Sequence, residues 1–245
     1  MGGGEPAGTA QGGIRYHSNH RLYGRRRGRK LRPAQQQLVD ELLPRLAIDL
    51  PCPGRRLDAE SLFVRPPADI WLEIGFGAGE HLAWQAEQYP EVGFLGVDYF
   101  LNGVAALLRQ IDRRMLNNIR ILRGDGRELL AALPADSLGR VFILFPDPWP
   151  KARHRNRRII QQDILDQLAR VMKRGAELRL ATDDMDYFQW MHAHFRAHPN
   201  FEWHSAWPAV ERELTDHWPQ TRYEAKALKL GHRPIHLRVL RKGHR

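Results

Sequence analysis

The chain has 245 residues, 42% of them hydrophobic, which is enough for one α/β domain or two small ones. No apolar run approaches the ~20 residues of a membrane-spanning helix, the N-terminal residues lack the apolar stretch of a secretory signal, and a single cysteine, Cys52, excludes an internal disulfide and a cysteine-based zinc site. We therefore expect a cytoplasmic protein, and its formal net charge of +10 favours an anionic partner.

The positive charge is concentrated in three segments. Residues 14–32 contain eight Lys and Arg and no acid, residues 149–158 contain five and no acid, and residues 222–245 contain eight and one acid. The rest of the chain is acidic, so these segments predict a face that binds a polyanion, with nucleic acid as the favoured partner. Solvated surface charge is the alternative. A membrane surface fits less well, because no basic segment carries a continuous apolar helical face.

The N-terminal quarter of the chain differs in composition from the rest. Residues 1–13 predict a flexible tail, and residues 14–59 predict a basic extension with one helix at residues 33–48, where leucines recur at helical spacing. We expect residues 60–245 to form a single domain.

From residue 69 onward, apolar strand-like runs alternate with amphipathic helix-like segments. The runs are IWLEIG, VGFLGVD, NIRILRGD, RVFILF and AELRLATD, and the helices are expected from about residue 80, after NIRILRGD, and at about residues 101–115, 157–172 and 185–198. This alternation predicts a doubly wound, mostly parallel sheet with helices on both faces. The last part, YEAKALKLG followed by IHLRVLR, predicts an antiparallel hairpin.

The first expected strand ends in a glycine-rich loop, LEIGFGAGEHL. Gly75, Gly77 and Gly79 lie between a strand and a helix, where an open α/β sheet lets a ligand approach the backbone. A dinucleotide-binding pattern would have its third glycine at the position of Glu80, and no phosphate-binding GKS or GKT follows. Glycines at this spacing also fit a tight structural turn.

Three acids lie near the ends of successive strands: Glu73, Asp98 and Asp125. A carboxylate at the end of the second strand can accept hydrogen bonds from the hydroxyls of a ribose. Several carboxylates together repel phosphates and favour a cationic sulfonium, so S-adenosylmethionine fits the pattern better than a nicotinamide dinucleotide. Each acid taken singly also fits a helix cap or a surface residue.

In FPDPWPKARHRNRR, three prolines alternate with Asp147 and Trp149 directly after a buried strand. Proline fixes φ and lacks an N–H, so we expect an extended, stiff platform at the ligand edge of the sheet. An aromatic ring nitrogen such as guanine N7 has a free lone pair, so Asp147 would orient the purine and offset developing positive charge rather than remove a proton. Trp149 can stack on a base. The alternative is a turn aspartate and a core tryptophan.

Five motifs in this order, LEIGFGAGEHL, FLGVDYF, FPDPWPKARHRNRRI, LRLATDD and TRYEAKALKLGH, resemble the bacterial tRNA (guanine-N7-)-methyltransferase family from about residue 25 to the C-terminus. The resemblance implies a class I methyltransferase that uses S-adenosylmethionine to methylate N7 of a guanine in the tRNA variable loop. It also implies a Rossmann-like, mostly parallel seven-stranded sheet with a C-terminal antiparallel hairpin, and a monomer with tRNA as its partner.

The resemblance also assigns roles to residues. It implies that Asp147 is the catalytic residue and that the cofactor contacts Glu73, Gly75, Gly77, Asp98, Asp125 and Asp147. It implies that the guanine and its surroundings contact Lys151, Asp183, Thr221, Arg222, Tyr223 and Glu224. RNA phosphates would contact Arg153, His154, Arg155, Arg157 and Arg158. No metal is expected, since His154 has no partners at ligand spacing.

The chain departs from the family pattern at three positions. Asp98 stands where Glu is frequent, Asn156 where Lys is frequent, and Tyr223 where Phe is usual. The acid and the aromatic ring are kept in the first and third cases. Only a single phosphate contact is put in doubt by Asn156.

Two other functions stay open on sequence alone. A metal-dependent nuclease or phosphatase would use Asp125, Asp147, Asp183 and Asp184, but would leave the glycine loop without a role. A non-catalytic RNA-binding module would need only the basic segments, and binding of S-adenosylmethionine without RNA separates it from the enzyme. We also expect that deleting residues 1–32 weakens tRNA binding and leaves cofactor affinity unchanged.

Overall fold

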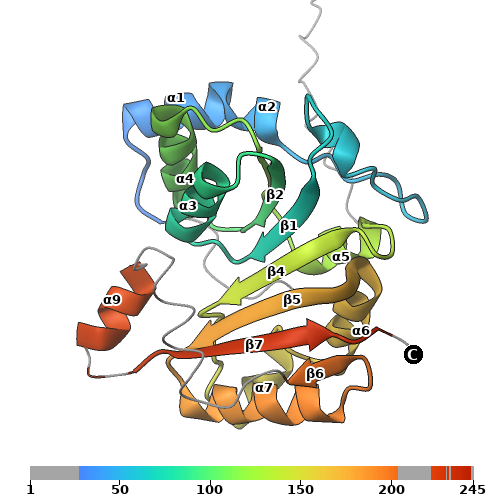
Figure 1. The fold of residues 1–245 in the computed structure, drawn as a ribbon. Coiled ribbons are helices and arrows are strands. Elements are labelled where there is room, and N and C mark those ends of the chain that lie inside the picture. The colour runs from blue at the N-terminus through green and yellow to red at the C-terminus, as the bar shows by residue number, and fades with distance from the viewer. Residues whose placement is uncertain (1–27, 204–221, 230, 232, 244–245) are drawn as a thin grey trace, which may run out of the picture.

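A mixed sheet of seven strands runs through the computed structural model, which describes residues 28–203, 222–229, 231 and 233–243 (Figure 1). Its strand order is β3-β2-β1-β4-β5-β7-β6. The strands are β1 (Asp69–Ile74), β2 (Val92–Val97), β3 (Ile119–Leu122), β4 (Leu138–Leu144), β5 (Met172–Thr182), β6 (Phe201–Trp203) and β7 (Ile235–Arg241). The first five pair in parallel, whereas β7 runs antiparallel to both β5 and β6. The expected seven-stranded, mostly parallel sheet is confirmed.

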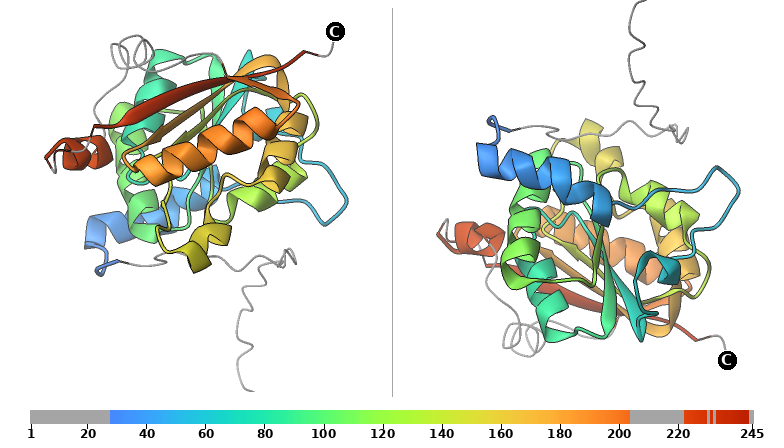
Figure 2. Two further views of the ribbon diagram at one scale, coloured as in Figure 1. Left: turned by 90° about the horizontal axis from the view of Figure 1, so that it is seen from below. Right: turned by 90° about the horizontal axis from the view of Figure 1, so that it is seen from above.

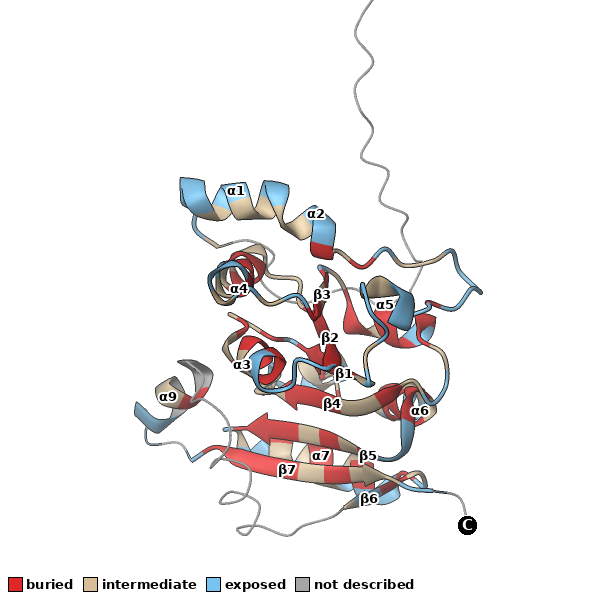
Figure 3. Cartoon of the chain, turned by 45° about the horizontal axis from the view of Figure 1, so that its top comes forward, coloured by how far each residue is buried: buried red, intermediate tan, exposed pale blue. Residues whose placement is uncertain are grey.

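Helices cover both faces of the sheet, as the alternation of strands and helices predicts. On one face, α3 (Glu80–Gln88) and α4 (Leu101–Arg114) bury Leu82 and Leu107 against Phe94 and Phe142. On the other face, α5 (Gly126–Ala132), α6 (Gln162–Val171) and α7 (Met185–Ala197) pack on the opposite side chains of the same strands. The strands are accordingly buried over most of their length (Figure 3). Such an arrangement is typical of a doubly wound α/β fold.

The N-terminal part contributes α1 (Pro33–Glu41), α2 (Leu43–Leu46) and the short 3₁₀ helix η1 (Glu60–Leu62). The leucine pattern predicts one helix over residues 33–48, but the chain bends after α1, where Pro44 enters the first turn of α2. Ile48 then donates its N–H to the carbonyl of Ile121 and extends the sheet edge. The division between an extension and a domain at residue 60 stays a prediction.

Two other expected elements differ from those observed. Residues 157–172 were expected as one helix, but the 3₁₀ helix η2 (Ala152–Arg157) and an extended stretch precede α6, because Arg158 and Ile160 are buried against α7. The segment YEAKALKLG was expected as a strand but lies mostly in α9 (Arg222–Lys229), and its Ala, Lys, Leu and Glu residues are strong helix formers. The antiparallel partners of β7 are therefore β5 and β6. Figure 2 shows α9 at the edge of the molecule, apart from α5, α6 and α7.

The strand order positions the site at the point of the sheet where the connections change from one face to the other. β1 lies between β2 and β4, and the chain leaves these two neighbours toward opposite faces of the sheet. Ligands of such sheets bind at the carboxyl ends of the strands at this point. Among the described residues, no helix has the length and apolar character to cross a membrane.

Candidate active site

A cavity of about 480 Å³ opens at the carboxyl ends of the parallel strands. The loops that follow β1, β2, β3 and β4 all contribute to its wall, and Arg157 and Ile159 add to it from the segment after the platform. Of the cofactor-binding residues expected from the sequence, the wall includes Gly75, Gly77, Asp98, Asp125 and Asp147. Parallel strands thus bring together residues that are far apart in the sequence.

The glycine loop needs its glycines for conformational reasons. Gly75, Gly77 and Gly79 have φ angles of 79°, 58° and 73°, a region that residues with a Cβ rarely adopt. Gly75 donates its N–H to the carbonyl of Val97 at 2.7 Å, which ties the loop to the end of β2. The backbone of the loop therefore lies directly on the cavity wall, with no side chains in between at Gly75 and Gly77.

Asp98 fixes the shape of the loop and faces the cavity. Its Oδ2 accepts the N–H of Gly77 at 2.8 Å, and its Oδ1 accepts the N–H of Phe100 at 2.8 Å. Burial raises the pKa of Asp98, and these two backbone hydrogen bonds oppose that rise. Each carboxylate oxygen has a second lone pair, so Asp98 can also accept hydrogen bonds from a ligand in the cavity.

Asp125 has a double position, as a helix cap and as part of the cavity wall. Its Oδ1 accepts the N–H of Arg127 at 2.9 Å at the start of α5, and its Oδ2 lies 3.5 Å from Nη1 of the same arginine. Burial and the charge of Asp125 raise the pKa of the neighbouring Glu128. The cap holds Asp125 at the cavity with a defined orientation.

Glu73 is not among the lining residues of the cavity. Its side chain is 3% exposed and lies 2.7 Å from Nδ1 of His81, whose Nε2 lies 3.1 Å from Gln85. The structure therefore places Glu73 in a buried contact between β1 and α3, and its expected contact with the cofactor stays a prediction. His81 was missed by sequence reasoning, although its spacing from Gln85 on one helix face was visible.

The platform after β4 differs from the extended segment that its prolines predict. Phe145 and Trp149 have φ angles of 51° and 43°, a left-handed conformation that costs about 1–2 kcal/mol for such residues. Phe145 donates its N–H to the carbonyl of Ala181 at 2.8 Å, and Pro148 accepts a hydrogen bond from Nε of Arg158 at 2.7 Å. The stiffness comes from these anchors as well as from proline.

Asp147 projects from this platform at the rim of the cavity. Its side chain is solvent-exposed on one side, while the cavity wall removes water from the other side and raises the pKa of the carboxyl. No hydrogen bond or ion pair from the described part of the chain engages its carboxylate. Trp149, whose ring was expected to stack on a base, is flanked by the His154 ring at 5.9 Å and by the Arg157 guanidinium at 4.9 Å.

The basic segment after the platform divides into surface and interior residues. Lys151 and Arg153 are exposed, and His154, Arg155 and Arg157 are half-buried. Desolvation and the charges of Arg157, Arg153 and Lys151 lower the pKa of His154. Arg158 is 0% exposed, which corrects the expectation that it contacts RNA phosphates.

The expected substrate-binding residues lie in several elements, and none of the described ones lines the cavity. Asp183 is exposed after β5, next to Asp184, which caps α7 by accepting the N–H of Tyr187 at 2.8 Å. Glu224 in α9 is buried, 3.7 Å from Nε2 of His236. Arg222 and Tyr223 also belong to α9. Thr221 lies outside the described residues.

The donor set distinguishes among ligands. Within the described residues, no three His, Cys, Asp or Glu side chains come together so as to hold a metal ion. The cavity wall combines three carboxylates with an exposed glycine backbone, which suits a ribose hydroxyl pair and a cationic group better than phosphates. S-adenosylmethionine has both features, so the residues present fit it.

Comparisons with known proteins agree with this geometry. A family model described as a putative methyltransferase matches residues 67–237. A tRNA (guanine-N(7)-)-methyltransferase of Rhodospirillum rubrum is 50% identical over 219 residues, covering 89% of this chain and 86% of the relative. The enzyme of the same name from Paramagnetospirillum magneticum is 48% identical over 216 residues, covering 88% and 90%. Among solved structures, the 16S rRNA methyltransferase KamB has a TM-score of 0.55 at 14% identity, covering 78% of this chain and 96% of that one, and supports the fold alone.

Proposed function

Because the chain belongs to the tRNA (guanine-N7-)-methyltransferase family and uses S-adenosylmethionine, we propose that it transfers a methyl group to N7 of a guanine in the variable loop of tRNA. The observation that carries this proposal is the position of Asp147. Its carboxylate stands at the rim of the cavity beside Asp98 and Asp125, without a partner among the described residues, where a base entering from the RNA side would meet it.

The residues of the cavity wall have distinct tasks toward the cofactor. Asp98, held by Gly77 and Phe100, accepts hydrogen bonds from the ribose hydroxyls, while the backbone of Gly75 and Gly77 lets the ligand approach closely. Asp125 adds negative charge at the end of β3. When bound, S-adenosylmethionine supplies an electrophilic methyl group on a positively charged sulfur.

The proposed chemistry needs no general base. The N7 lone pair of guanine forms the new bond to the methyl carbon as the S–CH₃ bond breaks, and the bonding electron pair stays on sulfur as a neutral thioether. Positive charge moves to the guanine ring, and no proton leaves N7 because it carries none. Asp147 orients the purine by accepting hydrogen bonds from its N–H groups and offsets the charge that develops.

The basic segment then acts as the RNA-binding surface. We assign phosphate contacts to Arg153, His154, Arg155 and Arg157, which lie at the surface or are half-buried. Guanine contacts are assigned to Lys151, Asp183, Thr221, Arg222, Tyr223 and Glu224 on the family resemblance. Affinity for tRNA should fall with salt in proportion to the phosphates contacted. We further propose that the protein acts as a monomer.

A methyl-transfer assay tests this function. The protein is incubated with labelled S-adenosylmethionine and unmodified tRNA, and the RNA is digested to nucleosides. We expect label in 7-methylguanosine, a loss of ~100-fold or more in kcat for Asp147→Ala, and unchanged tRNA affinity for that variant. Asp112→Asn, which changes an exposed carboxylate on α4, serves as the control and should retain full activity.

Two results would contradict the proposal. Label in a nucleoside other than 7-methylguanosine would refute the chemistry. Parallel loss of turnover and tRNA binding in Asp147→Ala would mean that this residue maintains the structure rather than handles the base. Binding of S-adenosylmethionine without RNA, measured by calorimetry, separates the enzyme from a plain RNA-binding module.

A further inference from the structure

Arg158 is a fully buried cation at the end of the basic segment. Its guanidinium lies between the rings of Tyr187 and Trp190 from α7, at 4.8 and 5.0 Å from their centroids. Its Nη2 donates to Asp186, also from α7. Burying a guanidinium costs free energy that such partners offset, so an arginine at this position is better explained by what it orients than by net stability.

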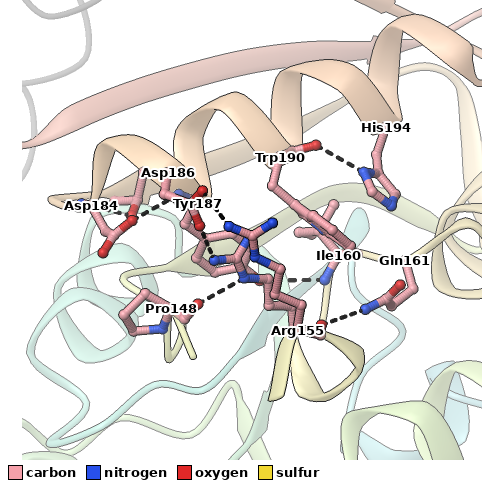
Figure 4. Close-up of polar contacts among 11 residues, drawn as sticks. Pro148, Arg155, Ile160, Gln161, Asp184, Asp186, Tyr187, Trp190 and His194 are labelled. Atoms are coloured by element: carbon pink, nitrogen blue, oxygen red, sulfur yellow. Dashed lines mark hydrogen bonds and ion pairs between the residues drawn. The ribbon is translucent and has the colours of Figure 1, made fainter. Parts of the chain in front are cut away.

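The group that Arg158 orients is the carbonyl of Pro148. Nε of Arg158 donates to this oxygen at 2.7 Å. The carbonyl belongs to the peptide between Pro148 and Trp149, where the backbone turns into the left-handed region, and it is one residue after Asp147. Figure 4 shows Pro148 on one side and Asp186, Tyr187 and Trp190 of α7 on the other, with Arg155 close to them.

The surrounding contacts make the arrangement rigid. Trp190 donates its Nε1–H to the carbonyl of Ile160 at 2.7 Å, and the hydroxyl of Tyr187 accepts the N–H of Ile160 at 3.4 Å. Side chains of α7 thus hold the backbone of Ile160, two residues after Arg158 in the chain. The guanidinium of Arg158 is thus fixed to α7 through Nη2 and Asp186, and its Nε can hold the platform through the Pro148 carbonyl.

Asp186 connects this buried pair to the surface. Its Oδ1 accepts from Nη2 of Arg155 at 2.8 Å, while its Oδ2 accepts from Arg158. Bonding to Arg158, together with the charges of Arg158 and Arg155, outweighs desolvation and lowers the pKa of Asp186. The carboxylate therefore stays ionised as the common anchor of one half-exposed and one buried arginine.

We propose that Arg158, anchored by Asp186, is a positioning residue for the reaction: it fixes the Pro148 carbonyl and thereby the placement of the Asp147 carboxylate at the cavity. The inference rests on the proposed function, because it concerns the same reaction. It assigns to Arg158 a task inside the protein in place of the phosphate contact expected from the sequence. A shift of about 1 Å in a group that orients the substrate can reduce the rate ~100-fold.

The test uses Arg158→Lys in the full-length protein. Lysine keeps the positive charge, but its single ammonium lacks the fork that reaches Pro148 and Asp186 together. We expect kcat to fall at least ~10-fold, with the KM values for tRNA and S-adenosylmethionine within about threefold of wild type. In an Asp147→Ala background the same substitution should cause no further loss, because its effect passes through Asp147.

The matched control is Arg170→Lys. Arg170 also holds backbone carbonyls, those of Leu133 and Leu130 at 2.7 and 2.6 Å, but at the C-terminal end of α5, which precedes β4 and lies at the opposite end of that strand from the platform. It should lose thermal stability and keep its kcat. All rates are measured at a temperature where each variant is folded.

A second variant, Asp186→Asn, keeps the test decisive if Arg158→Lys does not fold. Asp186 is 47% exposed, so its substitution leaves the core intact, and we expect kcat to fall at least ~3-fold without a rise in the tRNA KM. A kcat within twofold of wild type for the folded arginine variant, or for Asp186→Asn where that variant alone folds, overturns the inference. The inference is also overturned if Arg158→Lys lowers kcat in the Asp147→Ala background by the same factor as in the wild-type protein. Failure of the wild-type protein to methylate tRNA would instead refute the proposed function.

Discussion

Gly103 in α4 provides a sharp test of how the helix supports the cofactor loop. A Cβ at this position would lie 2.1 Å from the carbonyl oxygen of Gly77, whereas real Cβ atoms essentially never approach within 3.0 Å. In Gly103→Ala the Gly77 peptide and α4 must therefore separate by at least ~0.9 Å, and no side-chain rotation can relieve the contact because it is with backbone. The N–H of the same residue donates to Asp98, so the displacement reaches the carboxylate that we propose binds the ribose.

The magnitude follows from opposing terms. Alanine in place of glycine favours a helix by about 1 kcal/mol, and overpacking costs about 1–3 kcal/mol, so the net loss of stability is about 0–2 kcal/mol. For a domain of this size the melting temperature falls by no more than about 8 °C. The larger effect is on the ligand: we expect the Kd for S-adenosylmethionine to rise at least ~10-fold, or about 1.4 kcal/mol.

Calorimetric titration with S-adenosylmethionine and thermal unfolding measure the two effects separately. Ala106→Ser, which adds one atom at a half-buried position of the same helix, is the control and should change neither quantity appreciably. If Gly103→Ala binds the cofactor within twofold of wild type, the close approach of α4 to the glycine loop does not govern the cofactor site.

Three further predictions concern charge and the N-terminal segment. Burial raises the pKa of Asp147, so kcat should fall as the pH is lowered through a value above the ~3.9 of a free aspartate. Asp147→Asn should abolish this fall in kcat at acid pH. A wild-type kcat that stays constant down to pH ~4 would contradict the prediction. Burial alone would raise the pKa of Glu177, but Arg179, Arg140 and Arg238 lower it, so the carboxylate stabilises the fold above the unfolded pKa of ~4.3 and this contribution is lost as the pH falls through the lower folded value. Glu177→Gln should therefore cost about 1–3 kcal/mol at pH ~7 by thermal unfolding, with the difference narrowing under acid conditions; equal stability at neutral pH would count against the network. Deleting residues 1–27 removes basic residues and should weaken tRNA binding. The deletion keeps the hydrogen bonds of Asn102 with Gly28 and Arg29, so the affinity for the cofactor should stay unchanged. A weaker affinity for the cofactor would mean that the segment also supports the cavity.

The lining of the cavity was largely predictable because it depends on local order along the chain. Each parallel strand ends at the same edge of the sheet, so residues directly after strands, such as Gly75, Asp98 and Asp125, must come together once the strands are recognised. Glu73 lies within β1 instead, and alternation along the strand directs its side chain to the face covered by α3, where His81 engages it. The position relative to the strand end therefore separates a lining acid from a buried one.

The basic segment shows what required tertiary contacts. Arg157 and Arg158 are adjacent and chemically identical, and no sequence pattern distinguishes them; one lies over Trp149 at the cavity and the other is buried between rings of α7. That difference depends on α7, nearly thirty residues later in the chain, whose Asp186 and Tyr187 form the other half of the site.

The sequence by itself determined the α/β class, the glycine loop, the acids after the strands and the clustering of basic residues, because these follow from periodicity, backbone freedom and charge. Tertiary structure alone decided which acid is buried against α3, that YEAKALKLG lies mostly in a helix rather than a strand, and which arginine of the basic segment donates to the Pro148 carbonyl. Long-range packing decides burial and pairing at these positions, and local propensity carries no information about a partner that is distant in the chain.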